Sequence, residues 1–203
     1  MALFCKLWWN FRTKKTLWSE YMRNKYCRNK SPNLAMWKVG GGGSQVWKKM
    51  LQARDLIEHQ ILWKIRKGST SFWHDNWTGL GDLYTIIGEN FEWDDNYKRV
   101  DQVVHHEKWD VQTLMSIIPT ELVEYIISNI KPPRGRNEED IPCWMLETKG
   151  NFSVKTAWNY IRLKEEPNRI HKWIWTKGIP YKMAFMMWRL WKFKVPVDVQ
   201  VYL

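Results

Sequence analysis

With 203 residues, 44% of them hydrophobic and only 11 glycines and 8 prolines, the chain has a globular composition that excludes a disordered or collagen-like protein. Its formal net charge of +11 is uneven: residues 1–39 carry nine Lys/Arg against one acid, 148–203 carry eleven against three, and 82–147 carry six against fourteen. Such a chain can bind polyanions through its ends or pair its own segments, and no run approaches the roughly 18–20 apolar residues of a membrane span.

The first quarter of the chain predicts helices that are separated by a hinge. Residues 3–26 carry apolar stripes at helical spacing, and NKSPN at 29–33 favours a turn. The run VGGGGS at 39–44 indicates a flexible hinge, because it lacks the Gly-Lys-Ser/Thr ending of a phosphate-binding P-loop. Ser44 is a suitable N-cap for a helix over 45–58.

An aromatic-rich segment follows this helix. Residues 62–65 predict a strand, RKGST supplies a turn around Gly68, and residues 71–74 are expected to pair back as a hairpin. His74 directly precedes Asp75, and a histidine oriented by a neighbouring aspartate could in principle act as a general base. No serine, cysteine or second ligand lies at a recognisable spacing, so we interpret this pair as an exposed strand end rather than a catalytic dyad.

Two further groups of polar residues are interpreted as loops. Asp94 and Asp95 are reminiscent of polymerase aspartates that hold two metal ions, but no third carboxylate lies in a suitable hydrophobic strand. Since Asn96 follows them, the sequence predicts a polar turn. The run from His105 to Glu107 suggests metal ligands, yet adjacent side chains point to different faces, so a solvated loop is expected.

Helical spacing returns in the second half of the chain. Apolar faces predict helices over 111–118 and 122–130, and KPPRGRNEED at 131–140 predicts a linker and domain boundary. A second hairpin is expected over 143–154. Three more helices are predicted over 154–161, 170–174 and 180–194.

The last predicted helix is apolar almost all round, so most of it is expected to be buried. Together, these elements predict an α+β fold, mainly helical with two short β-hairpins. The expected domains are residues 1–130 and 141–203.

Cysteine and tryptophan usage adds two expectations. Cys5, Cys27 and Cys143 are far apart and odd in number, which argues against a disulfide framework and indicates a reducing compartment, the nucleus or cytoplasm. The start of the chain has no small-residue cleavage site, so no signal peptide is expected. Sixteen tryptophans could stack on unpaired bases, but most large aromatics fill cores, and the core interpretation is favoured.

Three blocks of the sequence carry a family resemblance: VWKKMLQARDLIEHQILWKIRKGSTSFWHDNW, WMLETKGNFSVKTAWNYI and WIWTKGIPYKMAFMMWRLWKFKVP. In this order they resemble plant non-LTR (LINE-type) retrotransposon polyproteins, in the stretch between the polymerase core and the ribonuclease H-like end. The third block is similar to the start of the reverse transcriptase zinc-binding domain. The resemblance covers nearly the whole chain. It implies that residues 1–130 are a connecting region, with the Trp-rich hairpin as scaffold.

The chain departs from this family in its metal ligands. In the family the helix matching 180–194 leads into a Cys-x-x-Cys and a later His and Cys, whereas this sequence ends at Leu203 before any of them. A structural zinc site needs four ligands, which the three scattered cysteines do not supply. We therefore expect a fragment of a retroelement-derived reading frame without catalytic, cofactor-binding or metal-binding residues, and without a small-molecule substrate.

Two classes of function remain open. The first is weak, non-specific contact with the backbone of RNA or DNA through four cations, with Trp191 and Phe193 beside them: Lys182, Arg189, Lys192 and Lys194. The alternative is a degenerate structural domain with no selected activity, or a protein-interaction module. A continuous basic face joining residues 6–38 to 182–194 would favour binding, whereas cations paired with the acidic middle would favour the alternative.

Overall fold

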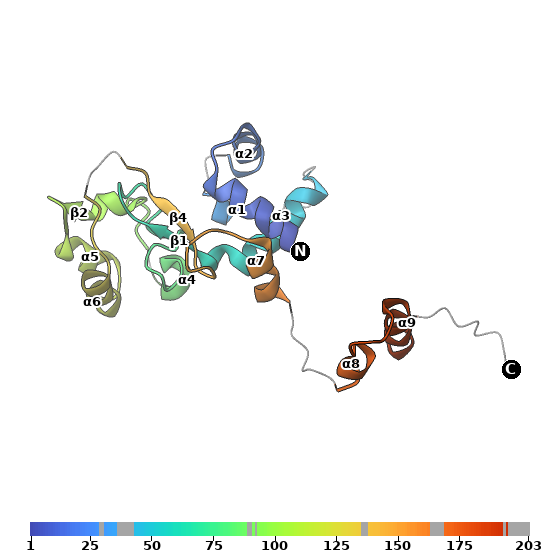
Figure 1. Cartoon of the computed structure of the whole chain (residues 1–203). Coiled ribbons are helices and arrows are strands. Elements are labelled where there is room, and N and C mark those ends of the chain that lie inside the picture. The colour runs from blue at the N-terminus through green and yellow to red at the C-terminus, as the bar shows by residue number, and fades with distance from the viewer. Residues whose placement is uncertain are drawn as a thin grey trace. The chain divides into compact units, whose positions relative to one another are not determined.

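The computed structural model describes residues 1–28, 31–35, 43–88, 91, 93–134, 138–162, 169–192 and 194. The chain divides into two compact units, residues 1–161 and 162–203 (Figure 1). Each unit is described by itself. No helix among the described residues is long and apolar enough to cross a membrane.

The larger unit begins with a helical layer. Helix α1 (Ala2–Thr13) packs along α3 (Gln45–Ile57), and α2 (Leu17–Met22) continues as a π-helical turn over Arg23–Cys27. The predicted cap of α3 is confirmed, because the Ser44 hydroxyl accepts a hydrogen bond from the backbone N–H of Trp47 at 3.2 Å. The glycine run before it lies partly outside the described residues.

The central sheet joins segments that are far apart in the sequence. Strand β1 (Ile61–Lys64) pairs antiparallel with β4 (Ile141–Trp144), and Ile61 lies opposite Trp144. The strand predicted at 62–65 is therefore present, but the prediction that residues 71–74 pair with it as a hairpin is wrong. The turn residues instead wrap around the carboxylate of Asp140, which accepts the backbone N–H groups at 66–68 and 70.

The second predicted hairpin, over 143–154, is also wrong. Residues 141–144 pair with β1, and residues 151–153 have no strand structure. Trp144 N–H donates to the Gly150 carbonyl at 2.8 Å, which closes a turn without building a ladder. Ser153 caps α7 (Val154–Ile161) as expected, because its hydroxyl accepts from the Thr156 N–H.

A hairpin that was not predicted lies in the acidic middle. Strands β2 (Val104–His105) and β3 (Lys108–Trp109) are joined by His106 and Glu107, whose φ angles of 49° and 59° suit a type I′ turn. These turn residues are exposed, so the solvated interpretation is confirmed. Helices α4 (Leu83–Ile87), α5 (Val111–Ile117) and α6 (Thr120–Asn129) complete this part. The predicted α+β, mainly helical class is confirmed.

Two aromatic-rich clusters form the core of the larger unit. The first joins α1, α3, β4 and α7, and its fully buried rings are Trp8, Phe11, Trp47 and Trp144. The second joins residues 72–77 to α4, α5 and α6, through Phe72, Trp77, Leu83, Leu114 and Ile126. Trp63 on β1 packs against both clusters. The favoured core role of many tryptophans is thus confirmed for these rings.

The compact units divide after Ile161, whereas the sequence KPPRGRNEED predicts a domain boundary in residues 131–140. Strand β4 and helix α7 follow that segment but belong to the larger unit. The physical reason is that β4 pairs with β1, and Ala157 of α7 is fully buried in the cluster that holds α1.

The smaller unit contains α8 (Arg169–Ile174) and α9 (Tyr181–Trp191), both as predicted. The predicted burial of α9 is wrong. Ala184 is buried, and so is Ile174 of α8, but Met183, Met186 and Leu190 are exposed. The reason is that, within the described part of this unit, α8 packs on α9 from one side.

Candidate nucleic-acid interface

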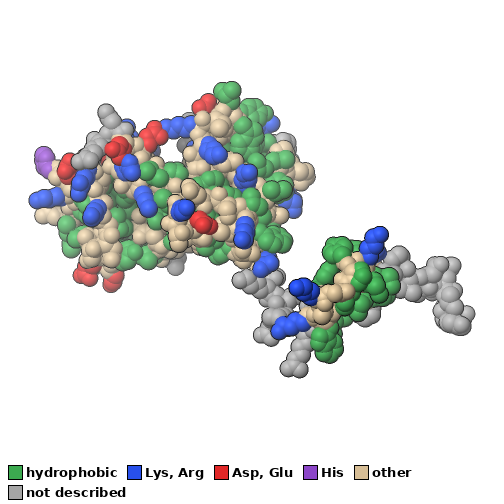
Figure 2. All heavy atoms as spheres, in the orientation of Figure 1, with side chains coloured by type: hydrophobic (Ala, Val, Ile, Leu, Met, Phe, Trp, Pro, Cys, Tyr) green, Lys and Arg blue, Asp and Glu red, His purple; other side chains and the backbone are tan. Residues whose placement is uncertain are grey.

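The two helices of the smaller unit lie in a stretch of single-sign charge. Residues 167–197 contain no Asp or Glu, but they contain seven cationic residues: Arg169, Lys172, Lys177, Lys182, Arg189, Lys192 and Lys194. Figure 2 shows Lys and Arg side chains around an apolar surface on this unit. Because the charged side chains of this stretch all carry the same sign, it is expected to attract polyanions.

The spacing of the cations on α9 places two of them on one face. Lys182 and Arg189 are seven residues apart, which is close to two full turns at about 3.6 residues per turn. The same geometry separates them by roughly 10 Å along the axis. Lys182 is exposed and Arg189 is half-buried. This spacing favours contact with successive phosphates over contact with one anion.

Three of the four predicted cations gather at the C-terminal end of α9. The Arg189 guanidinium donates through Nη2 to the Lys194 carbonyl at 3.1 Å. The Lys192 Nζ lies 4.5 Å from the Trp191 ring centroid, and the Lys194 Nζ lies 5.7 Å from that of Trp188. These cation–π contacts hold the ammonium groups beside aromatic rings. Lys182 lies apart from this group, near the start of the helix.

The sequence predicts two aromatic residues beside these cations, Trp191 and Phe193. Trp191 is half-buried and contacts Lys192. Phe193 lies outside the described residues.

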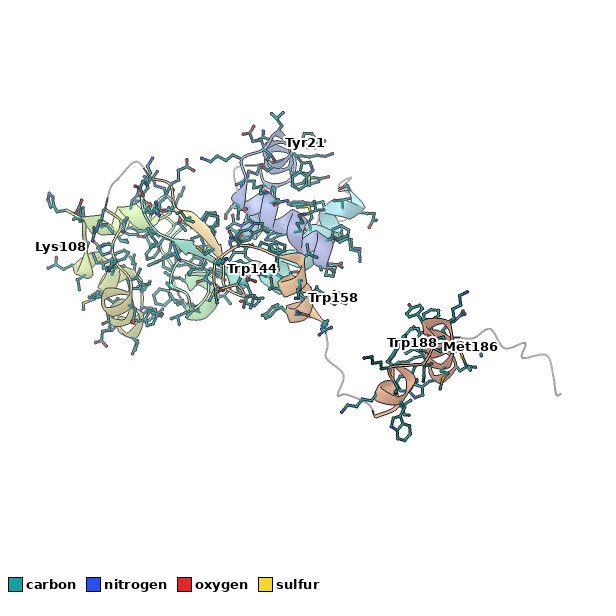
Figure 3. The ribbon with its side chains drawn as sticks, in the orientation of Figure 1. Tyr21, Lys108, Trp144, Trp158, Met186 and Trp188 are labelled. Atoms are coloured by element: carbon teal, nitrogen blue, oxygen red, sulfur yellow. The ribbon has the colours of Figure 1, made fainter. Side chains whose placement is uncertain are left out.

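The structure shows an aromatic row on α9 that is not among the features predicted from the sequence. The rings of Tyr181 and Phe185 are stacked with centroids 6.0 Å apart and planes 11° apart, and Phe185 and Trp188 follow at 5.7 Å and 21°. Figure 3 shows Trp188 on this helix. The signal was present as an i, i+4, i+7 spacing, which aligns side chains on one face.

Cations of the larger unit are arranged differently, because several pair with carboxylates. Arg12 pairs with Glu58 and Asp75, Lys15 with Glu139, and Arg66 with Glu138. Two of the N-terminal cations are thus neutralised, one of them by the acidic middle of the chain. This observation favours a structural role for part of the N-terminal charge.

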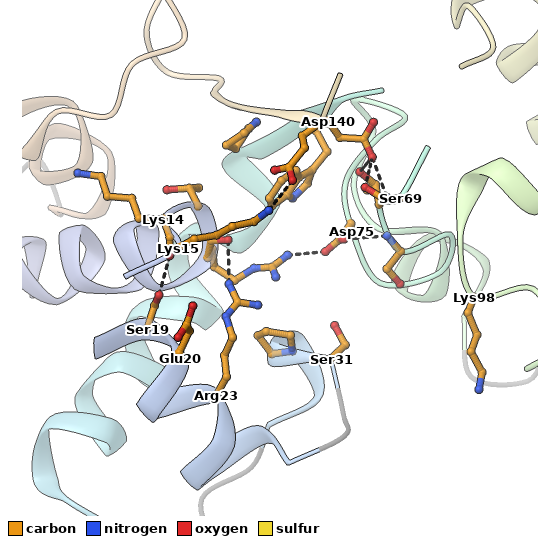
Figure 4. A pocket seen from close by; sticks show the side chains of 18 residues that line it. Lys14, Lys15, Ser19, Glu20, Arg23, Ser31, Ser69, Asp75, Lys98 and Asp140 are labelled. Atoms are coloured by element: carbon orange, nitrogen blue, oxygen red, sulfur yellow. Dashed lines mark hydrogen bonds and ion pairs between the residues drawn. The ribbon is translucent and has the colours of Figure 1, made fainter. Parts of the chain in front are cut away.

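The Arg12 cluster is a buried charge network on the wall of a polar cavity of about 610 Å³ (Figure 4). Glu58 accepts from Arg12 Nε at 2.9 Å and from the Trp8 indole N–H. Asp75 accepts from Arg12 Nη2 and from the Ser71 N–H. Burial raises the pKa of Glu58, with the Arg12 charge opposing it. The cluster links α1 to the segment after β1.

Asp140 also lines this cavity and organises the loop beside it. Its two carboxylate oxygens accept from four backbone N–H groups and from two hydroxyls, those of Ser69 and Thr70. Burial alone would raise the pKa of Asp140, but the donors from Arg66, Gly68 and Thr70 outweigh it, and the pKa is lowered. The carboxylate is therefore a structural acceptor that fixes the loop at 66–70.

The His74–Asp75 pair differs from the exposed strand end that was expected. Asp75 is buried and engaged by Arg12 and Ser71, and His74 is half-buried beside the rings of Tyr84 and Trp93. Burial lowers the pKa of His74, against the attraction of Asp75. The contacts of Asp75 assign it to the Arg12 network.

The two remaining polar groups are turns. Asp94 Oδ1 accepts from the Asn96 N–H at 2.9 Å, so the predicted polar turn is confirmed. At the β2–β3 turn, His105 Nε2 lies 3.4 Å from Asp110 Oδ2. Within the described ranges, no group of three or more His, Cys, Asp or Glu side chains could hold a metal ion.

Comparison with known protein families gives a match to the last quarter of the chain. The family model described as zinc-binding in reverse transcriptase matches residues 152–202, from the start of α7 past the end of α9. This quarter of the chain is similar to that family, in agreement with the resemblance of the third sequence block. No curated protein and no solved structure matches the chain.

The residues present do not fit the metal that this family implies. Residues 152–202 contain no cysteine and one histidine, His171, whereas a structural zinc site uses four ligands. Cys5 and Cys27 are buried in the first core cluster of the larger unit, and burial raises the pKa of both thiols. A raised pKa disfavours the thiolate that zinc binds.

We therefore expect zinc to leave the stability of the chain unchanged. An isothermal titration with Zn²⁺ should give no stoichiometric site, and the melting temperature should stay the same with or without added zinc. A single tight site accompanied by a higher melting temperature would contradict this expectation.

Proposed function

We propose that the chain is a non-catalytic region of a reverse transcriptase-like polyprotein from a LINE-type retrotransposon, and that its smaller unit binds nucleic acid weakly and without sequence preference. The observation that carries the binding proposal is the acid-free stretch 167–197 with its seven Lys/Arg residues. The match of residues 152–202 to the reverse transcriptase zinc-binding family supports the polyprotein origin. Plant origin rests on the resemblance of the three sequence blocks.

The chemistry of these side chains favours phosphate over base recognition. Lysine ammonium groups are point charges that contact backbone oxygens, and such contacts position a nucleic acid without reading its sequence. Arg189 already donates to the Lys194 carbonyl, which limits its geometry for a bidentate contact to a base. The four cations Lys182, Arg189, Lys192 and Lys194 are therefore proposed as the contact residues.

A fluorescence anisotropy titration with a labelled single-stranded oligonucleotide tests this proposal at low salt. Replacing the four contact residues by Gln is expected to weaken binding strongly. The matched control removes the same charge from exposed lysines of the larger unit, by changing Lys49, Lys64, Lys108 and Lys131 to Gln. This control should bind nearly as well as the unchanged chain. Equal losses in both variants would show that net charge, rather than the smaller unit, drives binding.

A protein-interaction role is the second candidate, and the exposed apolar side of α9 favours it. Met183, Met186 and Leu190 are exposed on this helix, as Figure 3 illustrates for Met186. Exposed apolar patches are typical of protein contacts. Failure to bind any oligonucleotide at low salt, with self-association of the chain, would favour this candidate over nucleic-acid binding.

A further inference from the structure

We propose that Tyr181 is a base-stacking residue, and that the smaller unit therefore prefers single-stranded nucleic acid to duplex. This inference rests on the proposed function and assigns its aromatic contact. The sequence suggests stacking near the C-terminal end of α9, at Trp191 and Phe193. This inference instead places the stacking residue in the first turn of that helix.

The geometry of the aromatic row supports this assignment. Tyr181 is 71% exposed, although Phe185 stacks behind it at 6.0 Å with planes only 11° apart. Phe185 is supported in turn by Trp188. A ring that is held from behind and open to solvent loses little freedom when a base stacks on it, which keeps the entropic cost of binding small.

The cations lie beside this row on the helix surface. Lys182 follows Tyr181 directly, at about 100° around the axis, and Arg189 shares the face of Lys182. Lys194 Nζ contacts the ring of Trp188 at the far end of the row. If a base of a nucleic-acid strand stacks on Tyr181, the phosphates of that strand would therefore lie along a line of positive charge.

The charge of the unit decides which occupant suits this aromatic face. An apolar protein segment would gain nothing from the seven cations of residues 167–197, a stretch without Asp or Glu, whereas a polyanion would. Base faces are accessible in a single strand but are stacked on one another in a duplex. The combination of exposed ring and cations thus favours a single strand.

Trp173 provides a matched control within the same unit. It is also 71% exposed, it lies on α8, and no ring pair joins it to another described aromatic. If exposed aromatic area alone determined binding, replacing Trp173 or Tyr181 would have the same effect.

The experiment compares Tyr181→Leu, Tyr181→Phe and Trp173→Leu in the full chain. Affinity is measured by anisotropy for labelled oligothymidine and for a mixed-sequence duplex of equal length. Tyr181→Leu should weaken single-strand binding about 5- to 150-fold, which corresponds to loss of one stacked base. Tyr181→Phe keeps the ring and should retain affinity. Duplex binding should change less than about twofold in every variant, because phosphate contacts dominate it.

The outcomes separate this inference from the proposed function. If Tyr181→Leu has no effect while the fourfold Gln variant loses binding, the stacking role is overturned and phosphate contact stands. The stacking role would also be overturned if Tyr181→Leu and Trp173→Leu lost the same amount of single-strand affinity, or if Tyr181→Leu lost duplex binding. The stacking role would also be overturned if Tyr181→Leu lost self-association but kept its oligonucleotide binding. A second copy of the chain, rather than a base, would then contact Tyr181. Failure of the fourfold variant to weaken binding would overturn the proposed function itself.

Discussion

Replacing Arg12 by Met is expected to destabilise the larger unit by about 3–5 kcal/mol, the range for a buried ion pair that loses one partner. Arg12 is buried and bridges Glu58 on one side to Asp75 on the other. Its removal leaves two largely buried carboxylates without the counter-charge that they share. Methionine fills a similar volume, so most of the loss should come from electrostatics rather than from a cavity.

The measurement is urea denaturation followed by tryptophan fluorescence. Lys15→Met is the control, because Lys15 pairs with Glu139 at an exposed position, and surface pairs contribute little. Adding Glu58→Gln and Asp75→Asn to Arg12→Met should recover part of the lost stability, since no unpaired buried charge then remains. An Arg12→Met variant as stable as Lys15→Met would show that the network does not stabilise the fold.

Replacing Asp140 by Ala is expected to cost about 3 kcal/mol or more in the free energy of unfolding. Hydrogen bonds to a charged acceptor contribute about 1.5–3 kcal/mol each, although several bonds to one carboxylate do not add fully. The variant leaves the N–H groups of Gly68 and Thr70 without their acceptor in a buried place. Gly68 has a φ of +81°, and it approaches Asp101 closely, so the loop has little freedom to rearrange.

The pH dependence gives this prediction a second readout. The pKa of Asp140 is lowered in the folded chain, so its contribution is fully present above the unfolded value of about 3.9 and is lost as the pH falls through the folded pKa. The difference in stability between the unchanged chain and Asp140→Asn should therefore narrow under acid conditions. A difference that stays constant from neutral to acid pH would contradict the structural role of this carboxylate.

Local patterns in the sequence predicted most elements but not their partners. Apolar spacing and capping residues predict α3, α7, α8 and α9, because these signals act within a few residues. The partner of β1 is β4, some eighty residues further along the chain. A turn with Gly68 favours a local hairpin, and nothing nearby in the sequence shows that Asp140 captures its N–H groups.

The candidate interface was predicted in part for a similar reason. The cations of α9 follow from composition, and Lys192 and Lys194 lie near aromatic rings, while Arg189 donates to the Lys194 carbonyl. The helix is apolar almost all round, so its sequence predicts burial without showing which side α8 covers. The exposed ring of Tyr181 follows from that packing, and it becomes apparent in the structure rather than in the spacing.

The salt dependence of oligonucleotide binding tests the role of the smaller unit most directly. Each phosphate contact on a single strand contributes about −0.7 to the slope of log K against log salt. Changing Lys182, Arg189, Lys192 and Lys194 to Gln should therefore make the slope shallower by up to about 2.8, whereas the Lys49, Lys64, Lys108 and Lys131 control should keep the slope of the unchanged chain. Equal slopes for the unchanged chain and the α9 variant would contradict the proposal that these four residues contact phosphates.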